Sequence, residues 1–429
     1  VYSMNQTIRS RIEQIKRGEI PEGYEKTPFG IFPCDWEKST LKKLGEFAKG
    51  KGIPGEKMKN EGIPCVGYGD IYMKYNYHFN QAKSFIDRTT ADESIQVGID
   101  TLLFTGTGET AEEIGKCVCY TGSDDIYVGG DIIIFNSVDV SPVFIAYQQY
   151  LPFAIKQKAG FGQGHSVVHI YKSDLEKLYC AYPKSKAEQD KIAEILQEQD
   201  RLIELKEKLI EEKKKRKQYL VQQLLTKKLR LPGIFEEWRN ITLGECLQEV
   251  NLRTTENNQY EALSVTREGI VRQKEQFNFQ RASDNNIGYK VIKKNQVAFS
   301  VLNLWMGSVD ILQSPEIGMI SPAYKVFDCI SNIIIPDFAK YFLRSAEMVW
   351  LYNVNSEIGA SIVRKNLDLD GLLQSNVTIP KIPEQRAIAE VLSKADDELD
   401  LLQKELEEQK RKKQSLMQLL LTGIVRVKA

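Results

Sequence analysis

The stretch "EEKKKRKQYLVQQLLT", from Glu211 to Thr226, returns near the other end of the sequence as "EEQKRKKQSLMQLLLT", from Glu407 to Thr422. Both copies begin with charged residues and end in leucines. The match continues toward the N-terminus, where "AEQDKIAEILQEQD" (187–200) aligns with "PEQRAIAEVLSKAD" (383–396) at a constant offset of 196 residues. Twenty of the 44 ungapped positions are identical. This is far more than chance gives, so the sequence contains an internal duplication.

Both copies have the pattern of long helices. Apolar residues recur every seven positions, and neither copy contains an internal Pro or Gly before Gly423. A seven-residue apolar stripe flanked by charge predicts a coiled coil, and about 40 residues would make a rod of roughly 60 Å. The apolar positions predicted to pair the helices or to bind partners are Ile195, Leu202, Leu209, Leu220, Leu224, Leu392, Leu399, Leu406, Leu416 and Leu420.

The distribution of charge predicts how the two helices pair. Residues 187–205 carry a net charge of −4, and residues 206–230 carry +7. In the second copy, residues 386–408 carry −5 and precede the basic run "KRKK" at 410–413. Antiparallel pairing places acid beside base at both ends, whereas parallel pairing places like charges together. Each helix could also simply complement its own dipole. We expect an antiparallel pair.

The segments between the helices predict two globular units of similar length. Both contain short β-type runs broken by Gly and Asn, and each precedes one long helix. The expected fold is therefore α/β (α+β), with two units joined by an antiparallel coiled coil in a pseudo-twofold repeat. The expected segments are an N-terminal helical segment at 1–23, a first unit at 24–183, a spacer helix at 184–230, a second unit at 231–381 and a second spacer helix at 382–429.

Composition restricts the class of protein. The 429 residues are 42% hydrophobic and 27% charged, which is ordinary for a soluble globular protein. No apolar run approaches the roughly 20 residues of a membrane span, and the polar N-terminus does not read as a secretory signal. Seven scattered cysteines indicate a reduced, cytoplasmic protein. The formal net charge of zero argues mildly against a nucleic-acid binder, although a basic patch matters more than the total.

The sequence resembles the specificity subunits of type I restriction–modification systems. The resemblance covers the chain from about Gly30 and rests on "IPKIPEQRAIAEVL" (379–392), its partner "YPKSKAEQDKIAEIL" (182–196), the helix ends at 223–227 and 419–423, and "SPAYKVF" (321–327). One departure is Ala187, where the second copy has Pro383. The resemblance implies two target-recognition domains that each read one half of a bipartite double-stranded DNA site. It also implies that the helices bind two methyltransferase (modification) subunits and that restriction subunits can join.

Signatures of catalysis are few. "FTGTG" (104–108) matches the F-x-G-x-G loop that binds S-adenosylmethionine in methyltransferases, but no two prolines are adjacent, which excludes the Pro-Pro motif of amino-methyltransferases. We read this loop as a strand edge. No P-loop is present, and "HSVVH" (165–169) with Cys117 and Cys119 is a poor zinc pattern. We expect a non-catalytic subunit without cofactor or metal. The alternatives are a stand-alone methyltransferase that uses S-adenosylmethionine and a tether that binds proteins only.

Candidate DNA contacts are polar or basic residues in segments expected to form exposed loops, some beside glycines that let the backbone approach phosphate. For each one, an ordinary solvated side chain is an equally good reading, and Trp305 could instead belong to the core. In the first unit the candidates are Lys74, Tyr75, Tyr77, His78, Lys83, Thr105, Thr107, Lys156, Lys158, Gln163 and His165. In the second unit they are Arg267, Arg272, Lys274, Arg281, Ser300, Asn303, Trp305 and Arg364.

Overall fold

The computed structural model describes residues 2–164, 167–233, 236–276, 285–361 and 364–428. The chain divides into two compact units. Unit 1 contains Val1–Lys206 and Glu405–Ala429, and unit 2 contains Glu207–Lys404. None of the described helices is long and apolar enough to cross a membrane.

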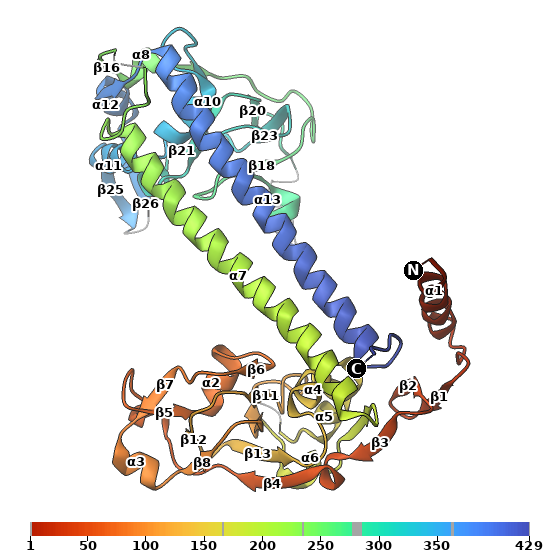
Figure 1. Cartoon of the computed structure of the whole chain (residues 1–429). Coiled ribbons are helices and arrows are strands. Elements are labelled where there is room, and N and C mark those ends of the chain that lie inside the picture. Colours follow the sequence, from red (N-terminus) through yellow and green to blue (C-terminus); the bar gives the residue numbers. More distant parts are fainter. Residues whose placement is uncertain (1, 165–166, 234–235, 277–284, 362–363, 429) are drawn as a thin grey trace. The chain divides into compact units, whose positions relative to one another are not determined.

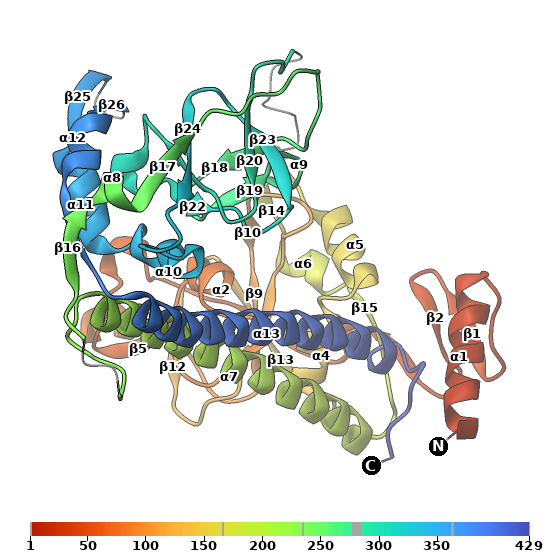
Figure 2. The ribbon, with the colours of Figure 1, turned by 90° about the horizontal axis from the view of Figure 1, so that it is seen from above.

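Two long helices, α7 (Lys186–Leu225) and α13 (Ile382–Leu420), each contribute one half to each unit. Within each unit the two halves lie side by side (Figures 1 and 2). In unit 1, Lys206 Nζ lies 2.6 Å from Glu405 Oε2, and in unit 2, Lys213 pairs with Glu398. Residue numbers therefore rise along α7 as they fall along α13. The helices run antiparallel, as the charge distribution predicted.

One face of each long helix packs against the other helix. On α7, Leu196 and Ile210 are buried, whereas Leu202 and Leu209 are 38% and 42% exposed. Thus, in the middle of α7, the second residue of each apolar pair turns inward, whereas the first residue, Leu202 or Leu209, faces water. Leu399 and Leu406 are the inward residues of α13, in the seven-residue step that the sequence predicted.

Unit 1 places two sheets around a shared core. The core includes Val66, Leu103, Val118 and Val128. The elements of unit 1 besides the long helices are α1 (Tyr2–Lys16), β1 (Tyr24–Thr27), β2 (Gly30–Pro33), β3 (Glu37–Thr40), η1 (Leu41–Lys43), β4 (Gly45–Lys49), η2 (Gly55–Lys57), β5 (Ile63–Val66), α2 (Tyr68–Met73), β6 (His78–Phe79), β7 (Ser84–Ile86), α3 (Arg88–Asp92), β8 (Ile95–Val97), β9 (Thr101–Thr105), β10 (Thr107–Gly108), β11 (Cys117–Tyr120), β12 (Ile126–Val128), β13 (Ile132–Ser137), α4 (Pro142–Gln148), α5 (Pro152–Phe161), β14 (Val168–His169), α6 (Lys172–Leu175) and β15 (Tyr179–Tyr182). The larger sheet has the strand order β4-β13-β9-β11-β6, and the smaller has β7-β5-β12-β8.

Unit 2 has a smaller main sheet, with the strand order β17-β24-β21-β22, and several strand pairs. Its elements are β16 (Arg239–Thr242), α8 (Leu243–Cys246), β17 (Leu247–Val250), β18 (Leu263–Val265), β19 (Ile270–Arg272), α9 (Gln273–Gln276), β20 (Lys290–Lys293), β21 (Val297–Ser300), η3 (Leu304–Met306), β22 (Val309–Ile311), β23 (Ile317–Ile320), β24 (Tyr324–Cys329), α10 (Pro336–Phe342), α11 (Ala346–Val354), β25 (Ser356–Ser361), β26 (Arg364–Leu367), α12 (Leu369–Gln374) and β27 (Asn376–Ile379).

The two units share a scaffold where they join the long helices. In unit 1, β15 precedes α7 and pairs antiparallel with β3. In unit 2, β27 precedes α13 and pairs antiparallel with β16. A helix that begins with proline follows the main sheet in each unit, α4 in one and α10 in the other. The main sheets differ between the units. The two copies therefore share the strand pair and the helix that pack next to the long helices, and they differ elsewhere.

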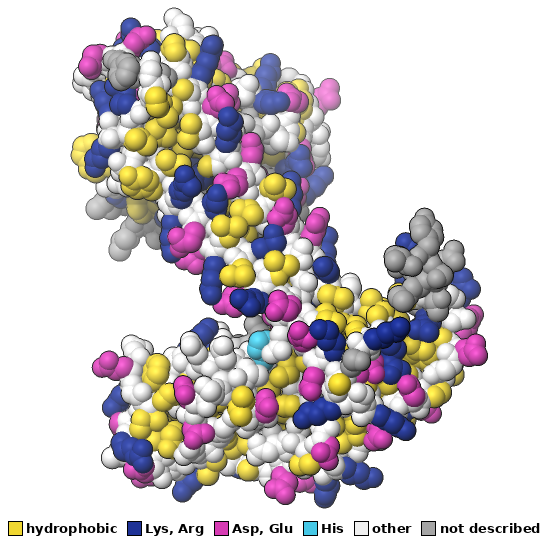
Figure 3. Space-filling view, in the orientation of Figure 1, with side chains coloured by type: hydrophobic (Ala, Val, Ile, Leu, Met, Phe, Trp, Pro, Cys, Tyr) yellow, Lys and Arg dark blue, Asp and Glu magenta, His cyan; other side chains and the backbone are white. Residues whose placement is uncertain are grey.

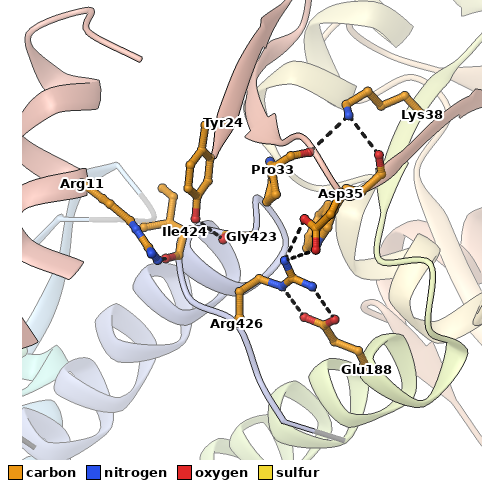
Figure 4. Close-up of polar contacts among 10 residues, drawn as sticks. Arg11, Tyr24, Pro33, Asp35, Lys38, Glu188, Gly423, Ile424 and Arg426 are labelled. Carbon is orange, nitrogen blue, oxygen red and sulfur yellow. Dashed lines mark hydrogen bonds and ion pairs between the residues drawn. The ribbon is translucent and has the colours of Figure 1, made fainter. Parts of the chain in front are cut away.

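Each long helix begins with a buried glutamate that is held by an arginine from beyond the end of the other long helix. In unit 1, Glu188 is only 7% exposed. Arg426 donates from Nε and Nη2 to both carboxylate oxygens of Glu188, at 2.6 and 2.8 Å, and its Nη1 also donates to Asp35 (Figure 4). This bidentate pair fixes the start of α7 against the segment that follows α13.

The same contact recurs in unit 2 with the roles of the helices exchanged. Glu384, at the start of α13, is 2% exposed. Arg230, which follows α7, donates to both of its carboxylate oxygens at 2.8 and 3.0 Å, and Trp238 Nε1 donates to the same carboxylate at 3.0 Å. We call these two contacts the clasps.

The glutamine after each clasp glutamate bonds the start of its long helix to a short helix of the same unit. Gln189 accepts from the backbone N–H of Ser141, at the start of α4, at 2.7 Å. Gln385 accepts from the N–H of Ile335, at the start of α10, at 2.9 Å. In each copy of the Glu-Gln pair, the glutamate therefore binds the arginine that follows the other long helix. The glutamine binds the backbone at the start of α4 or α10.

Breaking a clasp should destabilise its unit. In Arg230→Met, the buried carboxylate of Glu384 loses its cation, and we expect the free energy of unfolding to fall by about 3–5 kcal/mol. Urea unfolding followed by circular dichroism measures this. The control, Arg216→Met, removes an exposed charge from α7 and should change stability by less than about 0.5 kcal/mol. Equal effects of the two substitutions would show that the clasp has no special role.

Candidate nucleic-acid interface

The "FTGTG" segment is a strand edge in unit 1, as predicted. It forms the end of β9 and the start of β10, and the N–H of Gly106 donates to the carbonyl of Asp131 at 2.8 Å. A Cβ at Gly108 would lie 2.8 Å from the hydroxyl of Tyr72. Packing of the sheet therefore accounts for these glycines. Thr105, which was predicted to contact DNA, is buried and bonds through its hydroxyl to Tyr72 at 2.8 Å.

A partly exposed polar surface lies beside this edge. Thr107 Oγ1 lies 3.3 Å from His169 Nδ1, and the backbones of Gln163 and His169 form a β-bridge. Lys116 Nζ donates to the carbonyl of Tyr72 at 3.1 Å and to Asn76 Oδ1 at 3.3 Å. The structure thus brings the candidates Thr107 and Gln163 together. Lys116 is half-buried, and nothing in "EEIGKCVCY" distinguishes it from an ordinary surface lysine, so it was not among the predicted residues.

The segment 74–83 of unit 1 is held mainly by internal contacts. Lys74 Nζ lies 2.7 Å from Asp70 Oδ1 and 2.6 Å from Ser84 Oγ. Tyr75 is buried, and its hydroxyl accepts from the N–H of Lys83 at 2.7 Å. Lys83 itself is exposed. Of these three candidates, Lys83 is the one whose charge is open to a ligand.

Tyr77 and His78 face the long helices within unit 1. Lys413 Nζ lies 3.3 Å from the centre of the Tyr77 ring and pairs with Asp200. Asp200 also accepts from the hydroxyl of Tyr147 at 2.6 Å and lies 4.0 Å from His78 Nε2. Burial lowers the pKa of His78 below its ordinary value, which favours the neutral ring. These two candidates therefore connect the sheet to the helix pair.

In α5, the candidates Lys156 and Lys158 have opposite surroundings. Lys156 is exposed, whereas Lys158 is 4% exposed. The ammonium group of Lys158 donates to the carbonyls of Gly115 and Gln149 at 2.9 and 3.1 Å. Burial lowers the pKa of Lys158 to about 8. Lys158 therefore joins α5 to the sheet and has no free surface for DNA.

The buried ammonium group should make stability depend on pH. The pKa of Lys158 is about 8 in the folded chain and about 10.4 for an ordinary lysine, so between these values the unfolded state binds more protons. The unfolding free energy of the wild type should therefore rise relative to that of Lys158→Met from about pH 8 to pH 10, at up to about 1.4 kcal/mol per pH unit. Urea unfolding of both proteins at matched pH tests this, and a difference that stays constant with pH would contradict it.

In unit 2, one group of candidates surrounds the β18–β19 hairpin. Arg267 is exposed in the turn, and its carbonyl accepts from Arg344 Nη2 at 2.7 Å. Lys274, on α9, is exposed. Arg272 lies 3.1 Å from Glu261 and 3.2 Å from Glu275, so its charge is already compensated. Arg267 and Lys274 are the basic side chains here that remain open to phosphate.

A second group in unit 2 surrounds η3. Ser300 is buried, and Asn303 and Trp305 are half-buried. Lys365 Nζ lies 4.9 Å from the centre of the Trp305 ring. Arg364 begins β26. This group therefore offers Asn303 and Lys365 for polar contact, and Lys365 was not among the predicted residues. The remaining candidates, His165 and Arg281, lie outside the described residues.

The cysteines considered for zinc are structural. Cys117 and Cys119 are buried in β11, and burial raises the pKa of both thiols. The part of the chain that the structure describes holds no group of three or more His, Cys, Asp or Glu residues placed to bind a metal ion.

Most of the apolar positions predicted on the long helices are used in packing within a unit. Ile195, Leu416 and Leu420 pack with the core of unit 1, and Leu392, Leu220 and Leu224 with that of unit 2. Leu399 and Leu406 are also buried. Only Leu202 and Leu209 of this set present more than a third of their surface to solvent.

Each unit is an α/β fold that packs on an antiparallel pair formed by one part of α7 and one part of α13, and the sheets of the two units differ. Residues 33–214 match the family model described as the type I restriction modification DNA specificity domain. A chain named as the type I restriction enzyme MjaX specificity subunit of Methanocaldococcus jannaschii is 25% identical over 95% of this chain and 97% of its own.

Solved structures have the same fold. The S subunit of a type I restriction–modification system from M. genitalium aligns over 90% of this chain and 96% of its own, with a TM-score of 0.52 and 17% identity. The HsdS subunit from Thermoanaerobacter tengcongensis aligns over 93% of this chain and 100% of its own, with a TM-score of 0.50 and 15% identity. Over 95% of its length the chain is thus similar to a type I restriction enzyme specificity subunit, and it shares its fold with solved S subunits.

Proposed function

We propose that this chain is the non-catalytic DNA-specificity subunit of a type I restriction–modification complex. Each unit contacts one half of a bipartite double-stranded DNA site, and the helix pair sets the gap between the halves. The helix pair also carries two methyltransferase (modification) subunits, and restriction subunits can join this assembly. The observation that carries the proposal is a surface that the chain presents twice.

This surface is the outward face of the second half of each long helix, which we call the repeated stripe. On α7 it consists of Glu211, Glu212, Lys215, Gln218, Tyr219 and Gln222, and on α13 of Glu407, Glu408, Arg411, Gln414, Ser415 and Gln418. All twelve residues are exposed. Four of the six paired positions are identical, and a fifth exchanges Lys for Arg.

The first half of each helix provides a comparison within the same chain. Its outward positions pair Lys191 with Ala387, Glu194 with Glu390, Gln197 with Ser393, Glu198 with Lys394, Arg201 with Asp397 and Glu204 with Asp400. Only one of these six pairs is identical, and the exposed pair Leu205 with Leu401 adds a second identity in this half. Folding explains why buried residues of a repeat stay alike, but it does not explain why identity at exposed positions is more frequent in the second half than in the first. Two copies of one partner, bound once on each stripe, do explain it.

The side chains of both units suit backbone-positioning and base-reading contacts. Exposed lysines and arginines can neutralise phosphates, and amide and hydroxyl groups can bond to base edges. The surface that we propose for unit 1 includes Lys83, Thr107, Lys116 and Gln163. For unit 2 it includes Arg267, Lys274, Asn303 and Lys365. The diverged surfaces of the two units are consistent with two different half-sites.

The two alternative functions, a stand-alone methyltransferase and a tether that binds proteins only, predict different properties. A methyltransferase that uses the "FTGTG" segment needs room for a cofactor beside its glycines, but a Cβ at Gly108 would already meet Tyr72. A tether that binds proteins only would leave the assembled complex without affinity for DNA. The repeated stripe is compatible with such a tether, so DNA binding has to be measured on the assembly.

The test is the salt dependence of specific DNA binding by the chain assembled with its modification subunits. We expect Arg267→Ala with Lys274→Ala to weaken binding and to reduce the slope of log K against log salt by about 1.8, because each lost phosphate contact removes about 0.9. The control, Arg386→Ala with Lys394→Ala, removes two exposed charges from α13 in the same unit and should leave the slope unchanged. No DNA affinity in the wild-type assembly would contradict the proposed function.

A further inference from the structure

Unit 1 contains an open apolar cavity of about 760 Å³. It lies between the β1–β2 hairpin, α5 and the end of α13, and its walls include Phe29, Phe32, Phe153, Phe161 and Ile424. The rings are fixed by packing: Phe32 and Phe153 meet edge to face at 5.5 Å, and Phe29 packs on Tyr179 at 4.7 Å. The walls are therefore formed before any ligand binds.

The cavity combines apolar walls with positive charge. Lys156 and Lys177 line it, both are exposed, and no acidic residue is among its lining residues. Apolar side chains gather on the surface of unit 1 close to α1, as Figure 3 shows, and Ile15 of α1 contributes to the cavity wall. A ligand that matches this surface is apolar where it enters and acidic at its edges.

The cavity continues the repeated stripe of α13. Gln418, the last residue of that stripe, also lines the cavity, together with Thr422 one turn later. A protein that lies along this stripe toward the end of α13 therefore reaches the cavity without leaving the surface.

Unit 2 presents exposed apolar residues at the matching place. Its α11 corresponds to α5, because each follows the proline-started helix that bonds to Asp396 or Asp200 through a tyrosine hydroxyl. At the positions of Lys156 and Gly160, α11 carries Trp350 and Val354, which are 64% and 60% exposed. The core of unit 2 contains both the end of α7 and buried residues of α11, so α11 packs with the end of a long helix as α5 does in unit 1.

We propose that these two places, the cavity of unit 1 and the Trp350–Val354 face of unit 2, are seats for an apolar segment of the modification subunit. The proposal rests on the proposed function. Two copies of one subunit explain why apolar surface recurs beside both stripes, whereas a small ligand of the cavity would not require the second seat. In unit 1, acidic residues at the edges of the segment pair with Lys156 and Lys177.

The test uses the full chain and its modification subunit, without DNA, with native mass spectrometry for stoichiometry and titration calorimetry for affinity. Gly160→Glu places a bulky acid in the cavity, and the new Cβ meets nothing of the chain within 4 Å. Gly160→Ala is the matched control. Trp350→Glu tests unit 2, and Val138→Glu, which places an acid at another exposed apolar residue of unit 1, controls for the change in charge.

We expect two modification subunits on the wild type, and at least a tenfold weaker binding of one of them in Gly160→Glu and in Trp350→Glu. The variant with both substitutions should weaken both sites, and the two controls should bind like the wild type. Unchanged affinity in both glutamate variants would overturn the proposed seats while leaving the proposed function intact. A wild-type chain that binds no modification subunit would instead contradict the proposed function.

Discussion

The fold depends on the two clasps, in which a buried glutamate at the start of one long helix is held by an arginine beyond the end of the other. A buried carboxylate without its cation costs several kcal/mol, so each helix start requires the other helix to end beside it. Glu188 with Arg426 and Glu384 with Arg230 can both form only when the helices run antiparallel in one register. The net stability that such pairs add is small, and their main effect is to exclude parallel or shifted arrangements.

This fixed register decides which residues are left for function. Inward positions form the contact between the two long helices. The ion pair of Asp200 with Lys413 in unit 1 recurs as Asp396 with Lys217 in unit 2. Outward positions do not form this contact, yet four of the six paired positions of the repeated stripe carry identical exposed residues in both copies. Identity without a structural cause is the signature of a common partner. The sheets of the two units differ, as the proposed reading of two different DNA half-sites requires.

The sequence predicted the long helices, their antiparallel pairing and the strand-edge character of "FTGTG", because periodicity, charge and glycine spacing are local signals. It could not decide which of two adjacent apolar residues faces the other helix, since that depends on register: Ile203 and Ile210 turn inward, and Leu202 and Leu209 do not. The sequence also could not show which polar residues of unit 1 and unit 2 are exposed and which are buried. Lys158 and Thr105 look like loop residues but are buried by the packing of α5 and β9, and Lys116 gave no signal.

We propose that the two units divide the reading of one DNA site between them. The most direct test of this proposal is to replace residues 231–381 with the matching segment of a relative and to map methylated bases across a host genome. The clasp residues Arg230 and Glu384 lie just outside this segment, so the support of unit 2 by the long helices is retained. We expect one half of the methylated site to change while the other half stays the same. A change in both halves together would contradict it.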